Sequence, residues 1–171
     1  MYEVDSKDIV KELMDFPQSS VGAPIPIVFA SELKVAVAYC LNDVPKDWDG
    51  SIIRMVDTDS VEPIALVVFD RCSPHYFGPP NDEAFSGHPL ADRGLEPYGS
   101  FEIFNSSWIR KLERMNSVHP YHNKEQFFKG ERHIILTFHD SIFECIAQSY
   151  EIHISKGSMK DMVQEMTKLV L

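Results

Sequence analysis

The side chains best suited to chemistry lie close together between residues 133 and 147 of this 171-residue chain. Thr137, His139 and Glu144 all fall in this stretch. A histidine beside a glutamate can act as a general base or proton shuttle, or can supply half of a metal site. We therefore take His139 and Glu144 as candidate catalytic residues and expect His88, from a long loop, to approach them. The alternative is that they are ordinary polar positions on a half-exposed sheet face.

The chain from 133 to 147 also predicts a β-hairpin, because two runs of strand-forming residues flank a short polar break. A connection of two or four residues sets Phe138 opposite Phe143, and side-chain alternation then makes one face of the hairpin apolar. The other face is mixed and places Thr137 opposite Glu144. This register is what brings the candidate catalytic side chains together.

A long connection between 71 and 99 is rich in proline and glycine yet also carries aromatic residues. Long loops in compact domains tend to be functional or mobile, whereas disordered segments are poor in aromatic residues. Its larger apolar side chains include Tyr76, Phe77, Phe85 and Leu90. We expect this connection to fold over the mixed face of the hairpin and to carry His88 to it.

Motifs for metals, cofactors and nucleophilic catalysis are weak or missing. His119 and His122 have a spacing that metal sites use. His88 and His139 could join them, but the sequence has no closely spaced Cys pair and no His-Glu-x-x-His. It also lacks a Gly-x-Ser-x-Gly nucleophile elbow and a glycine-rich phosphate loop. We expect no resident metal and no cofactor.

The net charge of −10 is unevenly distributed along the chain. Residues 1–100 contain 7 basic residues (Lys and Arg) against 17 acidic ones (Asp and Glu). Residues 101–171 contain 9 basic and 9 acidic residues. A protein of this charge is a poor ligand for nucleic acid, which binds basic surfaces. A basic protein partner is compatible with it, although many acidic faces serve solubility alone.

One acidic segment also carries an aromatic residue that could anchor a partner. An aromatic side chain within a polar, charged rim is typical of protein interfaces. The candidate partner-binding residues are Asp43, Asp47, Trp48, Asp49, Asp57 and Asp59. The alternative is that Trp48 closes the core from a loop.

These observations give two hypotheses for the function. The leading one is a binding or inhibitor module, for instance an immunity-type antidote that covers a basic toxin or nuclease. The alternative is a small hydrolase-type enzyme that uses His139 with Glu144 and His88, with or without a metal. We expect the protein to be cytoplasmic, because it has an odd number of widely spaced cysteines, no signal peptide and no apolar run long enough to span a membrane.

The order of the predicted elements indicates a single α+β domain over residues 1–171. Strands are expected at 27–30, 33–41, 51–56, 64–69 and 100–104, followed by the hairpin, whose second strand could continue to residue 154. Helices are expected from a cap at Asp5 or Ser6 to about 15, from a cap within 105–107 to about 115, and from 158 to 170, with a short helical turn at 124–128. Strand runs follow one another without helical spacers, which favours a mainly antiparallel sheet of five to seven strands over parallel βαβ units.

Overall fold

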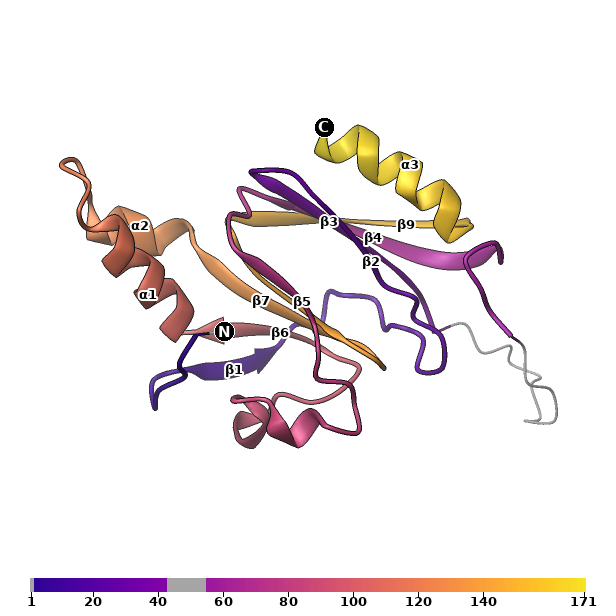
Figure 1. Ribbon diagram of the computed structural model, residues 1–171, viewed down its shortest axis with the longest axis horizontal. Helices are drawn as coiled ribbons and strands as arrows, with labels where there is room; N and C mark the ends of the chain where they lie inside the picture. The colour runs from indigo at the N-terminus through magenta and orange to yellow at the C-terminus, as the bar shows by residue number, and fades with distance from the viewer. Residues whose placement is uncertain (1, 43–54) are drawn as a thin grey trace.

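The computed structural model describes residues 2–42 and 55–171. In this part of the chain nine strands form two antiparallel sheets, with three α-helices beside them (Figure 1). The predicted α+β class is confirmed, but the strands form two sheets and outnumber the predicted five to seven. The strands are β1 (Ile9–Glu12), β2 (Ile27–Ala30), β3 (Lys34–Cys40), β4 (Glu62–Asp70), β5 (His75–Gly78), β6 (Ser100–Phe104), β7 (Arg132–Thr137), β8 (Ile142–Ala147) and β9 (Ser149–Gly157). The helices are α1 (Ser107–Asn116), α2 (Lys124–Gly130) and α3 (Met159–Val170), and Phe85–Gly87 and Ala91–Arg93 form two single 3-10 turns.

The predicted hairpin lies within the larger sheet, whose strand order is β1-β6-β7-β8-β5. The smaller sheet has the order β2-β3-β4-β9. Its strand β3 is buried on both faces after its first residue, as the apolar run around Val35 and Ala36 predicts. All neighbouring strands in both sheets are antiparallel.

The two sheets pack face to face and bury the apolar face of the hairpin. Leu136 and Phe143 on the larger sheet share one core with Val37 and Phe69 on the smaller sheet. The ring centroids of Phe69 and Phe143 are 5.3 Å apart. Burial of this face holds the hairpin in place, because exposing it would return large aromatic surfaces to water.

Helix α3 covers the other face of the smaller sheet (Figure 1). Its methionines pack against the small residues Ala36 and Ala38 of β3, which let the helix approach the sheet closely. Ser158 caps its first turn and forms a reciprocal capping box with Asp161. The predicted start of this helix at Ser158 is confirmed.

The outer face of the larger sheet is covered by the connection between β5 and β6. Phe85 and Leu90 are buried and pack against Ile135 and Ile142 of the hairpin. The expected cover of the mixed face is therefore present. Phe77 is an exception, because it belongs to the edge strand β5 and is 41% exposed.

The predicted N-terminal helix is wrong, because this segment forms the edge strand β1 paired with β6. The apolar positions that suggested a helical stripe are not buried together: Ile9 is 47% exposed and Met14 is 84% exposed. Backbone pairing with β6 decides the conformation here, since tertiary context overrides a weak local pattern.

Of the expected strand 51–56, residues 51–54 lie outside the described part of the chain, and Met55 and Val56 belong to no strand. Two predictions about the neighbouring strands are corrected. Strand β3 pairs directly with β4 instead of with an intervening strand. The expected extension of β8 to residue 154 is the separate strand β9, which crosses into the other sheet.

Within residues 2–42 and 55–171, none of the helices combines the length and the apolar character needed to cross a membrane.

Candidate functional site

The hairpin keeps the predicted faces but not the predicted register. Thr137 lies opposite Ile142, and Glu144 lies opposite Ile135, which is a shift of two residues. Because side chains alternate along a strand, such a shift leaves each of them on its own face. It nevertheless changes every partner, and the predicted pairing of His139 with Glu144 is wrong.

Glu144 instead belongs to a buried polar cluster on the outer face of the larger sheet. The Nε2 atom of His133 lies 2.7 Å from Glu144 Oε1, and both side chains are fully buried. The hydroxyl of Tyr2 donates a hydrogen bond to the same oxygen. Ser106 Oγ lies 2.7 Å from His133 Nδ1. The ring of Trp108 stacks on that of Tyr2 and closes the cluster on one side.

His88 interacts electrostatically with this cluster through Glu144 and His133. Its Nδ1 atom accepts a hydrogen bond from the backbone N–H of Leu90 at 3.1 Å, so a neutral ring carries its proton on Nε2. That Nε2 atom and Glu144 Oε2 are both buried, and neither has a hydrogen-bond partner within the described residues. The loop therefore brings His88 toward Glu144, as expected, but His139 belongs to a different group.

Burial sets the protonation of the cluster. It lowers the pKa of His88, an effect that the charge of Glu144 opposes and that of His133 reinforces. Burial and the neighbouring Glu144 raise the pKa of Tyr2. Both residues are thus held in their neutral forms at physiological pH.

Ser106, His133 and Glu144 are the residue types of a hydrolytic triad, but here they stabilise the fold. Ser106 is the N-cap of α1, and its Oγ accepts the backbone N–H of Ile109 at 3.2 Å. All three side chains are buried, so a substrate cannot contact them. The cluster fastens the N-terminal segment and the start of α1 to the sheet.

A second polar group surrounds His139 where the hairpin turns. Its Nδ1 atom lies 3.0 Å from Asp82 Oδ2 and 2.9 Å from the hydroxyl of Tyr98. The same hydroxyl donates a hydrogen bond to Asp82 Oδ2. The backbone N–H of Asp82 donates to the carbonyl of His139 at 2.9 Å, which fixes the loop to the turn. Two residues near opposite ends of the connection between β5 and β6 thus meet the hairpin turn at one histidine.

The geometry of this group selects one tautomer of His139. An ionised carboxylate only accepts hydrogen bonds, so the Nδ1 atom facing Asp82 carries the proton and Nε2 is the basic nitrogen. Hydrogen bonds from Tyr98 and then His139 lower the pKa of Asp82, and burial with Asp82 raises the pKa of Tyr98 to about 12. The His139 side chain is 42% exposed, and its Nε2 atom lies 3.9 Å from the exposed carboxylate of Asp140.

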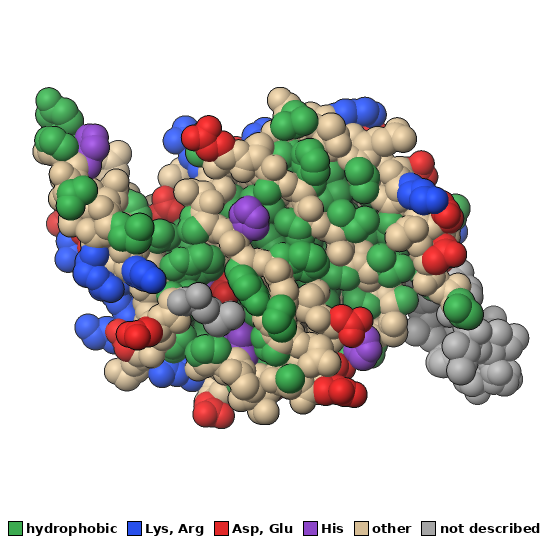
Figure 2. Space-filling view, viewed as in Figure 1, with side chains coloured by type: hydrophobic (Ala, Val, Ile, Leu, Met, Phe, Trp, Pro, Cys, Tyr) green, Lys and Arg blue, Asp and Glu red, His purple; other side chains and the backbone are tan. Residues whose placement is uncertain are grey.

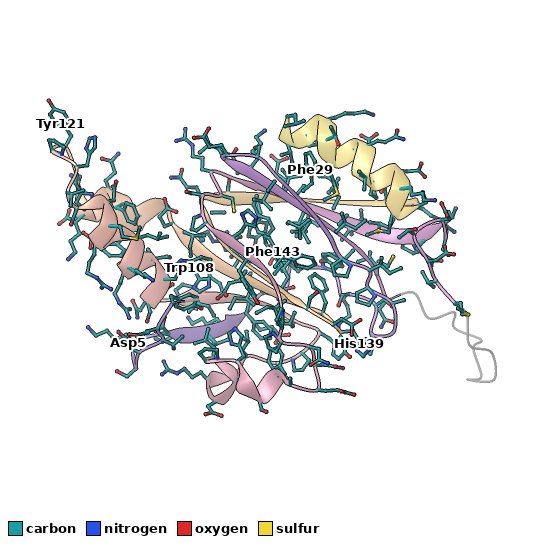
Figure 3. All side chains as sticks on the ribbon, viewed as in Figure 1. Asp5, Phe29, Trp108, Tyr121, His139 and Phe143 are labelled. Atoms are coloured by element: carbon teal, nitrogen blue, oxygen red, sulfur yellow. The ribbon has the colours of Figure 1, made fainter. Side chains whose placement is uncertain are left out.

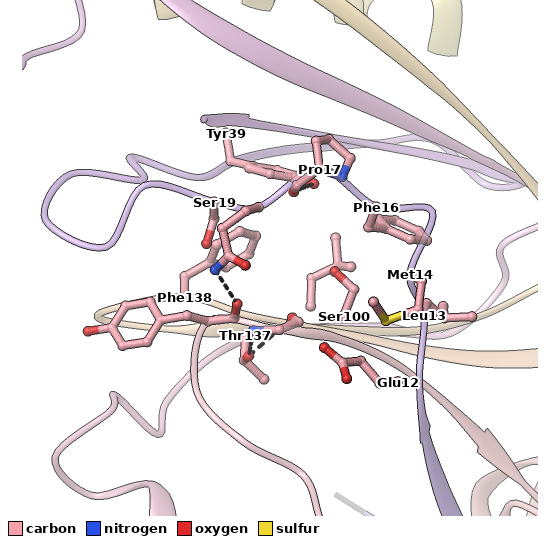
Figure 4. A pocket seen from close by; sticks show the side chains of 14 residues that line it. Glu12, Leu13, Met14, Phe16, Pro17, Ser19, Tyr39, Ser100, Thr137 and Phe138 are labelled. Carbon is pink, nitrogen blue, oxygen red and sulfur yellow. Dashed lines mark hydrogen bonds between the residues drawn. The ribbon is translucent and has the colours of Figure 1, made fainter. Parts of the chain in front are cut away.

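A small cavity between the two sheets shares Tyr98 with this group (Figure 4). Its volume is about 110 Å³, and Phe138, next to His139, forms part of its wall. The hydroxyl of Ser19, which also lines it, is buried and has no hydrogen-bond partner in the described part of the chain. A buried polar atom without a partner is suited to a small polar ligand or water.

Models of protein families, curated proteins and solved structures were compared with the chain, and none of them matches it. The function therefore has to be argued from the sites themselves.

The histidines considered for a metal site do not meet. The Nε2 atom of His122 lies 3.0 Å from Glu113 Oε1, whereas His119 accepts a hydrogen bond from the backbone of Tyr121. In the part of the chain that the structure describes, no three His, Cys, Asp or Glu side chains are arranged to hold a metal ion. His88 and His139 lie in the two separate groups described above.

Of the candidate partner-binding residues, Asp43, Asp47, Trp48 and Asp49 lie outside the described part of the chain. Asp57 and Asp59 form a turn in which Asp57 Oδ1 accepts hydrogen bonds from the backbone and hydroxyl of Ser60 at 2.9 Å. These hydrogen bonds lower the pKa of Asp57. Asp59 forms an ion pair with Lys160 at the start of α3.

Sequence reasoning missed five residues of the two polar groups: Tyr2, Asp82, Tyr98, Ser106 and His133. His133 could have been found from the correct register, in which it is a diagonal neighbour of Glu144. Asp82 and Tyr98 lie in the loop already singled out for its aromatic content, but nothing in the sequence indicates which of its residues faces the turn.

Proposed function

We propose that the protein is a small hydrolase-type enzyme in which His139 acts as general base toward water. The observation that carries this proposal is the geometry of His139, whose Nδ1 atom is held by Asp82 while the ring remains 42% exposed. A carboxylate that orients a histidine in this way keeps the basic Nε2 atom available. In this proposal Asp82 replaces Glu144 as the acidic partner.

The proposed reaction is the hydrolysis of a small polar substrate. His139 Nε2 takes a proton from a water molecule while the water oxygen attacks the electrophilic centre of the substrate. The imidazolium then returns that proton to the leaving group. Asp82 stabilises the imidazolium, since it is an ionised carboxylate in direct contact with the ring. The polar groups of Asp82, Tyr98 and Asp140 around the exposed ring support a polar substrate.

The test is turnover of small chromogenic esters, amides and phosphate esters. His139→Ala should lower the rate of any substrate that is turned over by about 100-fold or more, because a positioned general base contributes that much. Asp82→Asn should lower it less. His153→Ala is the matched control, because His153 is an exposed histidine on β9 with an ion pair of its own. Equal rates for His139→Ala and the wild type, or no turnover at all, would contradict the proposal.

The acidic turn at residues 57–60 favours a second candidate function, the binding of a basic protein partner. Asp57 is fixed by hydrogen bonds, and the backbone N–H of Lys160 donates to the carbonyl of Thr58 at 3.3 Å, which docks the turn on α3. Met55 and Val61 on either side are 92% and 60% exposed. A fixed negative charge beside exposed apolar side chains suits a partner with basic and apolar contacts.

Association kinetics test this second candidate. Asp57→Asn combined with Asp59→Asn should slow association with a basic protein retained by the immobilised chain and should flatten its dependence on salt. Asp92→Asn combined with Glu125→Gln makes the same change of charge at two other exposed positions. An unchanged association rate for the first pair, or an equal loss for the second, would argue against the turn as the binding surface.

A further inference from the structure

A cleft between the helical pair α1–α2 and strands β6 and β7 has the character of a ligand site. Its volume is about 560 Å³, within the range of small-molecule sites in proteins. It lies at the α1 end of the molecule, and Figure 3 shows His139 and Trp108 of α1 well apart. The cleft is therefore separate from the proposed hydrolytic site.

The lining of the cleft is basic, although the protein as a whole has a net charge of −10. Four of its residues are cationic: Lys7, Arg110, Lys129 and Arg132. Lys and Arg side chains also gather over α1 and α2 on the face shown in Figure 2. A local excess of positive charge on an acidic protein attracts an anion to this place in particular.

The arginines of the cleft already have partners, whereas the lysines are available. Arg132 makes two hydrogen bonds to Glu102, at 3.1 and 2.7 Å, and Arg110 pairs with Asp5 at 2.6 Å. The ammonium groups of Lys7 and Lys129 make no hydrogen bond or ion pair with any described residue, and both residues are exposed. The charge of Lys7 also contributes to lowering the pKa of Asp5.

The two carboxylates in the lining oppose an anion only weakly. The charge of Glu102 is neutralised by Arg132. Burial raises the pKa of Glu131 and so disfavours its charged form, with a smaller opposite effect from a hydrogen bond of Gln148. Asp5 and Asp8 compensate the charge of Arg110, at 2.6 and 3.7 Å. The positive character of the cleft therefore comes from the ammonium groups of Lys7 and Lys129.

Part of the wall of the cleft is apolar. Ile103 and Ile109 form its buried part, while Phe104 and Phe128 are 42% and 37% exposed. The ammonium group of Lys11 lies over the Phe104 ring, 4.7 Å from its centroid. Partly exposed aromatic rings beside ammonium groups fit a molecule with an apolar body and an anionic end. The start of α1 does not offer a phosphate cradle, because the backbone N–H groups of Ser107 and Ile109 already donate to Asp8 and Ser106.

We propose that this cleft binds a small apolar carboxylate, whose charged end contacts Lys7 and Lys129 and whose body lies against Phe104 and Phe128. Octanoate is a suitable probe, and octanamide has the same length without the charge. Addition of octanoate to ¹⁵N-labelled protein should shift the amide signals of residues 102–110 and 128–132, and octanamide should bind at least about tenfold more weakly, because the charge-assisted contacts are lost.

Charge reversal gives the decisive comparison. Lys7→Glu combined with Lys129→Glu should weaken octanoate binding by about tenfold or more. Lys111→Glu combined with Arg114→Glu makes the same change of charge at exposed positions of α1 that do not line the cleft. All four positions are exposed, so the variants should fold. Absence of octanoate binding at millimolar concentration, equal binding of octanamide, or an equal loss in the control pair would overturn the proposal.

Discussion

At the scale of single residues, His88 is a buried side chain with one polar atom that has no hydrogen-bond partner among the described residues. The residue is only 4% exposed, and that polar atom is Nε2. Burial lowers its pKa although Glu144 opposes the effect. The folded state therefore favours the neutral ring. Protonation of His88 at lower pH disfavours the folded state.

Acidification between pH 7.5 and 5.5 should destabilise the protein through His88. Because the pKa of His88 is lower in the folded than in the unfolded chain, its contribution is fully present above the ordinary histidine pKa of about 6.5 and declines below it. His88→Asn keeps an acceptor for the Leu90 N–H and removes the titration. Urea unfolding at both pH values should show a smaller decline in the free energy of unfolding for this variant than for the wild type. His153→Asn should show the same decline as the wild type. An equal decline in all three proteins would contradict the role of His88.

The sequence predicted the faces of the hairpin but not the partners of its polar residues. Alternation alone assigns Leu136 and Phe143 to one face, and it does so for any register that differs by two residues. The contacts of Glu144 depend on that register and on Tyr2, which is 142 positions away in the chain. No local pattern contains such a contact, so the pairing of His139 with Glu144 could not have been tested from the sequence.

At the scale of elements, amino-acid composition correctly predicted that one connection packs over the sheet. Helical periodicity gave the wrong conformation for the edge strand β1. The aromatic residues between 71 and 99 predicted that this connection packs over the sheet, and Phe85 and Leu90 do so because the outer face is otherwise open to water. The spacing of Ile9 and Val10 with later apolar residues fits a helix, but the same residues are β-branched and suit a strand. The unpaired edge of β6 decides between them.

At the scale of the whole molecule, the division into two sheets could not be predicted. Strands β8 and β9 follow each other with one intervening residue, Gln148, and read as a single run. The chain changes sheet at that point, and only the packing of Phe69 against Phe143 and their neighbours shows why. The α+β class follows from element order, whereas the sandwich depends on which faces are buried together.

Loss of stability in acid should also be a property of the whole molecule. Hydrogen bonds lower the pKa of four aspartates in different parts of the fold, and for each a hydrogen bond from a nearby group is the largest cause: Asp5, Asp57, Asp82 and Asp161. Their pKa values are lower in the folded than in the unfolded chain. Their stabilisation is therefore present above the ordinary aspartate pKa of about 3.9 and is lost as the pH falls through the folded values.

Ser158→Ala tests this at the start of α3, where the Ser158 hydroxyl is the largest cause of the lowered pKa of Asp161. The variant loses an N-cap and should reduce the free energy of unfolding by about 1 kcal/mol at pH 6. At pH 3 the difference from the wild type should be smaller, because protonation of Asp161 already weakens its half of the capping box in both proteins. Urea unfolding at the two pH values measures both differences, with Ser86→Ala, at an exposed serine, as the control. A difference from the wild type that is equal or larger at pH 3 would show that the Ser158–Asp161 contact does not contribute to the loss of stability in acid.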